Sequence, residues 1–158
     1  ILECARVLQA FVQQYGPVHG AITHSFGGMV LAFALVQGLA VGRVACIASP
    51  ARVEFLVERF ARMLAMPDSV VANLKSRLER RFDANVWELL ATDANAAKLD
   101  MPALVIHDVD DAGVPWQQGR QIAEAWPGAR FVKTQGLGHN RILRDPAVIG
   151  RVVAFIDG

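Results

Sequence analysis

Cysteine is scarce in this sequence. Only Cys4 and Cys46 occur among 158 residues, and their spacing matches no common metal-ligand pattern. We therefore expect no disulfide framework and no metal site, and a reducing compartment, the cytoplasm, is favoured. Long apolar runs are absent too, since none approaches the roughly 20 residues that a membrane-spanning helix needs. No basic segment leads into a short apolar one, as it would in a secretory signal.

An excess of charge of one sign is also missing. Sixteen Lys and Arg residues face fifteen Asp and Glu residues, which leaves a formal net charge of +1. This balance argues against a nucleic-acid-binding surface and against a polybasic membrane anchor. Hydrophobic residues make up 53% of the chain, so we expect one globular domain with a substantial apolar interior.

Short apolar runs alternate with helical patterns along most of the chain. The runs show little alternation of apolar and polar residues, which is typical of strands buried on both faces in a parallel sheet. The pattern therefore predicts an α/β fold with a parallel sheet flanked by helices. The expected strands are residues 18–22, 43–48, 103–107 and 130–134, and the expected helices are residues 2–15, 29–37, 116–126 and 146–156.

The middle of the chain has a different pattern of apolar residues. Residues 51–100 contain apolar stripes at helical spacing but no strand-like run, and they predict up to four short helices. We divide the chain into a core, residues 1–50 and 101–158, and a helical cap insertion, residues 51–100. A set of packing helices with a solvated basic face is the alternative reading of the insertion.

A serine lies at the turn after the first expected strand. Residues 23–27 (THSFG) approximate the G-x-S-x-G pattern, in which a sharp strand-to-helix turn exposes the serine hydroxyl. Such a turn needs small residues because the strand and helix backbones pass close together, and we expect Gly27 and Gly28 to meet that need. Thr23 departs from the pattern because it is β-branched.

Two further loops carry residues that could act with Ser25. Asp110 and Asp111 lie in the loop after the third expected strand, in residues 107–115 (HDVDDAGVP), and His139 follows the fourth, in residues 136–139 (GLGH). In a parallel sheet the carboxyl ends of the strands meet at one edge, where ligands bind. We therefore expect these side chains to lie close together.

The order Ser, Asp, His and these three contexts resemble the α/β-hydrolase family. The resemblance covers nearly the whole chain and implies that Ser25 is the nucleophile, His139 the general base and Asp111 the residue that orients it. Asp110 is the alternative acid, because Asp108 stands where the family commonly has glycine. The resemblance also implies that the backbone N–H of Phe26 stabilises the oxyanion.

The function expected from this resemblance is hydrolysis of an ester or related acyl bond through an acyl-enzyme, without a cofactor. Met29, Phe55 and Phe60 are candidates for contact with a small-molecule acyl substrate. Transfer of the acyl group to an alcohol or thiol, with the same triad, remains open. A non-catalytic binding protein on a hydrolase fold is the alternative from another class.

The histidines outside the triad are expected to be structural. The side chain of His24 should point away from that of Ser25, and His107 should belong to the core or support the site from behind.

The beginning of the chain lacks features that the family would supply. The sequence opens within a helical pattern and without Met, and nothing strand-like precedes residue 18. The loop that carries the family's second oxyanion donor has no counterpart here. We therefore expect a truncated chain whose N-terminal strands are missing, with an exposed sheet edge that a further segment or a homodimer could pair.

Overall fold

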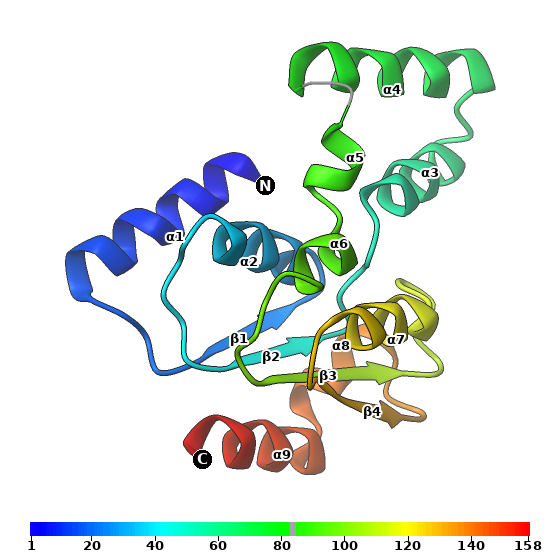
Figure 1. Cartoon of the computed structure of the whole chain (residues 1–158). Coiled ribbons are helices and arrows are strands. Elements are labelled where there is room, and N and C mark those ends of the chain that lie inside the picture. The colour runs from blue at the N-terminus through cyan, green and yellow to red at the C-terminus, as the bar shows by residue number, and fades with distance from the viewer. Residues whose placement is uncertain (83–84) are drawn as a thin grey trace.

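Four parallel strands form the centre of the molecule (Figure 1). The structure is a computed structural model that describes residues 1–82 and 85–158. The strands are β1 (Ala21–His24), β2 (Val44–Ile47), β3 (Ala103–Asp108) and β4 (Arg130–Thr134), and they lie in the order β1-β2-β3-β4. All three pairings are parallel, which confirms the predicted fold class.

The two central strands are buried on both faces. Every residue of β2 and β3 is buried, as their apolar composition predicts. Successive side chains of a strand point to opposite faces, so each strand contributes to two separate cores. In β2, Val44 and Cys46 pack into the larger core, whereas Ala45 and Ile47 pack into a smaller one.

Helices cover the two faces unequally. The larger core is formed with α1 (Leu2–Tyr15), α2 (Phe26–Val36) and α7 (Trp116–Ala125), and the smaller core with α9 (Pro146–Asp157). In Figure 1 α9 lies below the sheet and the other three helices lie above it. The N-terminus of α9 is capped by the Asp145 carboxylate, which accepts a hydrogen bond from the N–H of Val148 at 3.0 Å.

The first strand and its helix differ from the expected boundaries. Strand β1 begins at Ala21 rather than residue 18, and Val18 forms only an isolated bridge with Val41. Helix α2 begins at Phe26 rather than residue 29. Gly27 and Gly28, which were expected in the turn, are therefore part of the helix, because a single residue, Ser25, makes the change of direction.

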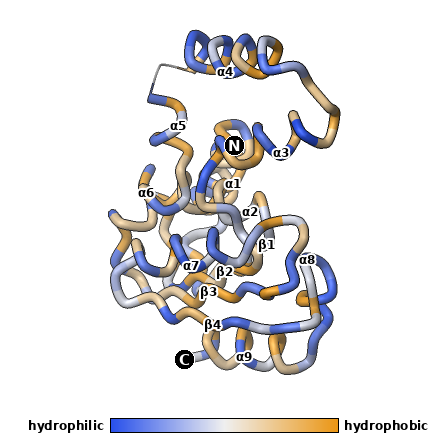
Figure 2. The backbone as a smooth tube through the Cα atoms, turned by 90° about the vertical axis from the view of Figure 1, so that its right-hand side faces the viewer, coloured by the Kyte–Doolittle hydropathy of each residue, from blue (hydrophilic) through white to orange (hydrophobic). Residues whose placement is uncertain are grey.

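The described residues of the insertion form helices joined by turns and short connections, and none of them is in a strand. The insertion contains α3 (Val53–Met63), α4 (Asp68–Phe82), α5 (Val86–Leu89) and α6 (Thr92–Ala96). Four helices agree with the upper number expected, and residues 83 and 84 of the insertion lie outside the described part. Helix α4 buries no residue and stands apart from the sheet, with hydrophilic and hydrophobic residues alternating along it (Figure 2). By contrast, α6 is largely buried.

Hydrogen bonds attach both ends of the insertion to the core. At its start, the Gln118 side-chain oxygen on α7 accepts from the N–H groups of Ala51 and Arg52, at 2.9 and 3.3 Å. At its end, the Thr92 hydroxyl donates to the Pro50 carbonyl at 2.8 Å. The base of the insertion is thus fixed, whereas its outer helix α4 has few neighbours.

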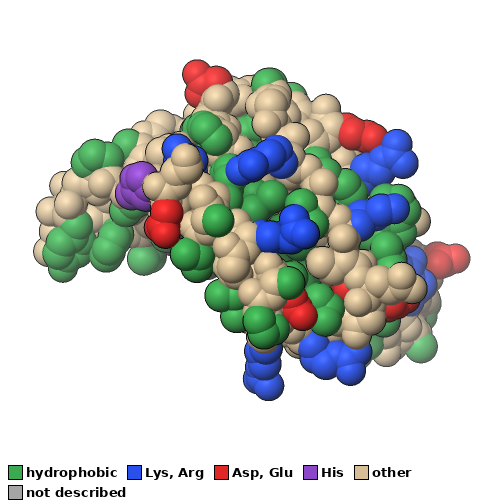
Figure 3. Space-filling model, turned by 90° about the horizontal axis from the view of Figure 1, so that it is seen from below, with side chains coloured by type: hydrophobic (Ala, Val, Ile, Leu, Met, Phe, Trp, Pro, Cys, Tyr) green, Lys and Arg blue, Asp and Glu red, His purple; other side chains and the backbone are tan. Residues whose placement is uncertain are grey.

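One edge of the sheet is apolar and uncovered. Strand β1 has β2 on one side and no strand of the described chain on the other. Ile22 on this strand is 58% exposed, and Val7, Phe11 and Tyr15 of the neighbouring α1 are also exposed. Seen from below, hydrophobic side chains gather at the α1 end of the molecule, whereas Lys and Arg are spread among other residues (Figure 3).

No described helix is both long and apolar enough to cross a bilayer.

Candidate active site

Ser25 occupies a strained backbone position between β1 and α2. Its φ of 53° and ψ of −125° lie in a region that residues other than glycine rarely adopt. The N–H of Ser25 donates to the Ile47 carbonyl at 2.9 Å, which joins the turn to the end of β2. The strained residue is therefore tied to the sheet through its backbone N–H.

The close approach of strand and helix requires glycine at one position only. A Cβ atom at Gly28 would overlap the Ser49 side chain and lie 2.7 Å from its Cβ. A Cβ atom at Gly27 would meet only the Thr23 Cβ, at an ordinary 3.7 Å. The expectation of a steric need is confirmed for Gly28, but it is wrong for Gly27.

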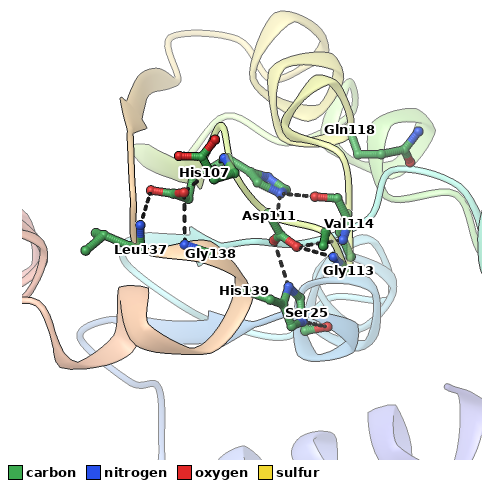
Figure 4. A network of polar contacts seen from close by, with 12 residues as sticks. Ser25, His107, Asp111, Gly113, Val114, Gln118, Leu137, Gly138 and His139 are labelled. Atoms are coloured by element: carbon green, nitrogen blue, oxygen red, sulfur yellow. Dashed lines mark hydrogen bonds and ion pairs between the residues drawn. The ribbon is translucent and has the colours of Figure 1, made fainter.

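Ser25, His139 and Asp111 form a hydrogen-bonded chain (Figure 4). The Nε2 atom of His139 lies 3.0 Å from the Ser25 Oγ, and its Nδ1 atom lies 2.7 Å from Oδ2 of Asp111. Asp110 instead accepts from the N–H of Gly136 at 2.8 Å. Of the two acids that the sequence left open, the structure brings Asp111 to the histidine.

The Asp111 carboxylate is buried and fully hydrogen-bonded. Its Oδ1 atom accepts from the N–H groups of Gly113 and Val114, at 2.7 and 2.8 Å, and Oδ2 receives His139 and His107. Burial alone would raise the pKa of Asp111, but the hydrogen bonds from His107, Val114 and His139 outweigh it and hold the pKa well below its usual range. The carboxylate therefore stays ionised at neutral pH.

The histidine has to reach across the whole sheet. Ser25 follows β1 and His139 follows β4, and these are the two outer strands, roughly 14 Å apart at ordinary strand spacing. The segment after β4 crosses the ends of the two middle strands and ends in a short helix, α8 (Gly138–Arg141), which continues into the 3-10 helix η1 (Ile142–Arg144). Neither helix was predicted from the sequence.

Asp108 fixes this crossing segment at its midpoint, at the end of β3. Its carboxylate accepts from the hydroxyl of Thr134 at 2.7 Å and from the N–H groups of Leu137 and Gly138, at 3.2 and 2.9 Å. Burial would raise the pKa of Asp108, but these hydrogen bonds and one from the N–H of Asp110 lower it overall. The residue that departs from the expected glycine thus anchors the histidine loop.

His24 fixes the far end of the crossing segment. Its Nε2 atom lies 2.9 Å from the His139 carbonyl oxygen, and the two imidazole rings are 4.8 Å apart between centroids. The expectation that His24 packs rather than reacts is compatible with this contact, although the contact with His139 itself was not foreseen. Sequence alone could not find it, because 115 positions separate the two residues.

The candidate donor to the oxyanion, the backbone N–H of Phe26, lies at the first position of α2. The N–H of Phe26 has no acceptor within the described chain, as expected for the first turn of a helix. Phe26 is 43% exposed and contributes to the lining of two pockets, of about 620 and 330 Å³. The larger pocket is mainly apolar and lies between α1, α2 and the free edge of β1.

The three candidate substrate contacts are not brought together. Met29 is fully buried inside α2, so its side chain presents no surface to a substrate, and that prediction is wrong. Phe55 and Phe60 lie on α3, outside the linings of both pockets beside Phe26. Helix α3 does contact the acid loop, because Arg59 donates to the carbonyls of Ala112, at 2.9 Å, and Gly113.

Within residues 1–82 and 85–158, no group of three or more His, Cys, Asp or Glu side chains is arranged to hold a metal ion. The polar groups that converge at the site are a hydroxyl, an imidazole and a carboxylate in series. Such a series can transfer a proton from the hydroxyl to the imidazole while the carboxylate stabilises the resulting cation.

Comparison with known proteins gives matches of several kinds. An α/β-hydrolase family model described as TAP-like protein matches residues 84–157. Over 61 residues the chain is 39% identical to "Putative carbamate hydrolase RutD" of Pseudomonas savastanoi pv. phaseolicola, a match that covers 39% of this chain and 24% of that protein. The chain thus spans about a quarter of the length of this relative.

Solved structures resemble the chain over most of its length. A bromoperoxidase from Bacillus anthracis superposes with a TM-score of 0.68 and 14% identity, covering 96% of this chain and 72% of that one. The esterase RhEst1 from Rhodococcus sp. ECU1013 gives a TM-score of 0.62 and 20% identity, covering 88% and 65%. At such identities the likeness concerns the fold. Together with the partial match to the family model, it shows that the chain has the α/β-hydrolase fold.

Proposed function

We propose that this protein is a serine hydrolase that cleaves an ester or a related acyl bond through an acyl-enzyme on Ser25. The observation that carries the proposal is the hydrogen-bonded chain from Ser25 through His139 to the buried, ionised Asp111. The strained conformation of Ser25 supports it further, since backbone strain in a non-glycine residue is concentrated at functional sites.

The proposed reaction has two halves. Ser25 Oγ attacks the acyl carbon while its proton moves to Nε2 of His139, and the N–H of Phe26 stabilises the oxyanion. His139 then returns the proton to the leaving group, which departs and leaves the acyl group on Ser25. In the second half a water molecule gives a proton to His139 and attacks the carbonyl carbon of the acyl-enzyme. His139 then gives that proton to Ser25 Oγ as the bond to the acyl group breaks and the acid leaves. Asp111 remains ionised throughout.

The substrate proposed is a small molecule whose acyl group is activated or is small to medium in size. The apolar pocket beside Phe26 supports an apolar acyl or leaving group. The similarity to a protein named as a carbamate hydrolase extends the proposal to carbamates, in which the acyl carbon bears nitrogen. We further propose that α3–α5 act as a cap over the site, supported by the Arg59 contacts with the acid loop.

Acyl transfer to an alcohol or thiol is the second candidate. It uses the same three residues, and it would be favoured if the cap excluded water from the acyl-enzyme. The two reactions are separated by adding methanol to an ester assay and comparing the yields of methyl ester and free acid. Free acid as the main product supports hydrolysis.

The proposal is tested by labelling with a fluorophosphonate, in which the serine oxygen displaces fluoride from phosphorus. We expect the wild-type chain to be labelled and the Ser25→Ala and His139→Ala variants to remain unlabelled. Labelling that persists in Ser25→Ala would refute Ser25 as the nucleophile. A folded wild-type chain that is never labelled would favour the non-catalytic alternative.

A further inference from the structure

His107 is the penultimate residue of β3, and the reaction proposed above assigns it no step. Its side chain is 0% exposed, and it is one of the largest fully buried side chains of the molecule. Burying a polar ring costs free energy unless its nitrogens find partners. The partners that His107 does have therefore indicate what the residue contributes.

One ring nitrogen of His107 faces two acceptors. Its Nε2 atom lies 2.9 Å from the Val114 carbonyl oxygen and 3.3 Å from Oδ2 of Asp111 (Figure 4). A carbonyl can only accept a hydrogen bond, and an ionised carboxylate likewise only accepts. The proton of the ring must therefore lie on Nε2, where it is shared between the two oxygens.

The other ring nitrogen faces a glycine backbone. Nδ1 of His107 has no hydrogen-bond partner within the described chain. A Cβ atom on Gly119 of α7 would overlap Nδ1 and lie 3.0 Å from the ring Cγ. The Gly119 backbone therefore packs directly against this edge of the ring and offers it no acceptor. This packing leaves a lone pair on Nδ1 and favours the same tautomer.

The Nε2 proton meets the oxygen that His139 also uses. Oδ2 of Asp111 lies 2.7 Å from Nδ1 of His139 and 3.3 Å from Nε2 of His107, so two imidazoles flank one carboxylate oxygen (Figure 4). The other oxygen is held by the N–H of Val114, whose carbonyl is the second acceptor of His107. His107 thus holds both the carboxylate and the loop that carries it.

We propose that His107 is the positioning residue of the catalytic acid, acting as a fixed Nε2–H donor that orients the Asp111 carboxylate toward His139. This inference rests on the proposed function, because Asp111 needs a fixed orientation only if it serves His139 in catalysis. The hydrogen bond from His107 also draws on the negative charge of Oδ2 and so weakens the attraction between this oxygen and His139. A carboxylate without this donor would hold the protonated imidazole of His139 more tightly.

The tautomer is tested first, by long-range ¹H–¹⁵N correlation spectra of the ¹⁵N-labelled wild-type chain, a measurement that needs no turnover. The His107 signals are assigned by their loss in His107→Gln. We expect a protonated Nε2 and an unprotonated Nδ1. A proton found on Nδ1 would overturn the proposal whether or not the chain is an active hydrolase.

The catalytic consequence is tested with two substitutions of similar size. Gln can place an N–H near the position of Nε2, whereas Leu cannot. For hydrolysis of a p-nitrophenyl ester we expect His107→Leu to lower kcat roughly 10- to 100-fold, the range that a hydrogen bond to a charged group implies, with KM changed less than about threefold. The acid limb of the kcat/KM profile should move to higher pH. In His107→Gln, kcat and the acid limb should both lie close to their wild-type values.

Two outcomes separate this inference from the proposed function. An active wild-type chain with Leu and Gln variants of equal kcat and unchanged pH profile would overturn the role of His107 and leave the proposed function standing. A wild-type chain whose activity survives Ser25→Ala would refute the proposed function, and the role in catalysis with it, even if the Nε2–H tautomer were found. Should His107→Leu fail to fold, His107→Asn, which is too short to reach Oδ2, replaces it with the same expectation.

Discussion

Ser25 Oγ and His139 Nε2 lie 3.0 Å apart, although 114 positions separate the two residues and they follow opposite outer strands of the sheet. The distance is bridged by the segment between β4 and α8, which is held at the end of β3 by Asp108 and at the end of β1 by His24. The arrangement of Ser25, His139 and Asp111 therefore depends on Asp108 and His24 as well.

Asp108 should make stability depend on pH. Its pKa is lowered in the folded state, so its contribution is fully present above the unfolded pKa of about 3.9 and is lost as pH falls through the lower folded value. We expect Asp108→Asn to lower the free energy of unfolding at pH 7 by about 2 kcal/mol. Urea unfolding at pH 7 and at about pH 3 should show a smaller loss on acidification in the variant than in the wild type. An equal loss in both would contradict the anchoring role.

The two neighbouring acids should differ in their effect on catalysis. Asp111→Asn removes the charge that stabilises the protonated histidine and favours the wrong tautomer, so kcat for an ester should fall by about 10⁴. Asp110→Asn is the matched control, because Asp110 contacts Gly136 and not His139, and its kcat should stay within about threefold of the wild type. The reverse ranking would return the acid role to Asp110.

The two glycines of the turn should respond differently to alanine. Gly28→Ala should destabilise the fold by about 1–3 kcal/mol, because its Cβ would overlap Ser49. Gly27→Ala should be neutral or stabilising by up to about 1 kcal/mol, since it has room in a helix. Ser49→Gly should rescue Gly28→Ala in a double-mutant cycle read by urea unfolding. Additive effects would contradict the steric account.

The uncovered edge of β1 should cause self-association. We expect the 158-residue chain to dimerise or aggregate in sedimentation experiments, because an unpaired strand with an exposed apolar residue, Ile22, pairs readily with another chain. Ile22→Lys places a charge on that edge and should shift the distribution toward monomer. A wild-type chain that sediments as a clean monomer would contradict this expectation.

The sequence predicted the architecture well because the strands that matter are buried on both faces. β2 is apolar throughout and β3 is apolar over its first four residues, and each lies within one residue of its expected range. The candidate triad could be predicted for the same reason, since residues that follow parallel strands must meet at one edge.

The parts that could not be predicted depend on contacts between distant residues. Nothing local shows that Asp108 accepts hydrogen bonds from residues 26–30 positions away, or that His107 shares a carboxylate with His139. The prediction for Met29 was wrong because the sequence of a helix does not show whether an apolar residue in its first turn faces a pocket or the protein core. The short α8 was missed because a four-residue helix has no periodicity.

The acyl-enzyme itself is the most direct test of the proposed mechanism. The chain is mixed with a p-nitrophenyl ester, quenched with acid within the first turnover, digested and analysed by mass spectrometry. We predict a burst of about one nitrophenol per chain and an acyl adduct on the peptide that contains Ser25. Ester turnover without a burst or adduct, and undiminished in Ser25→Ala, would contradict the account.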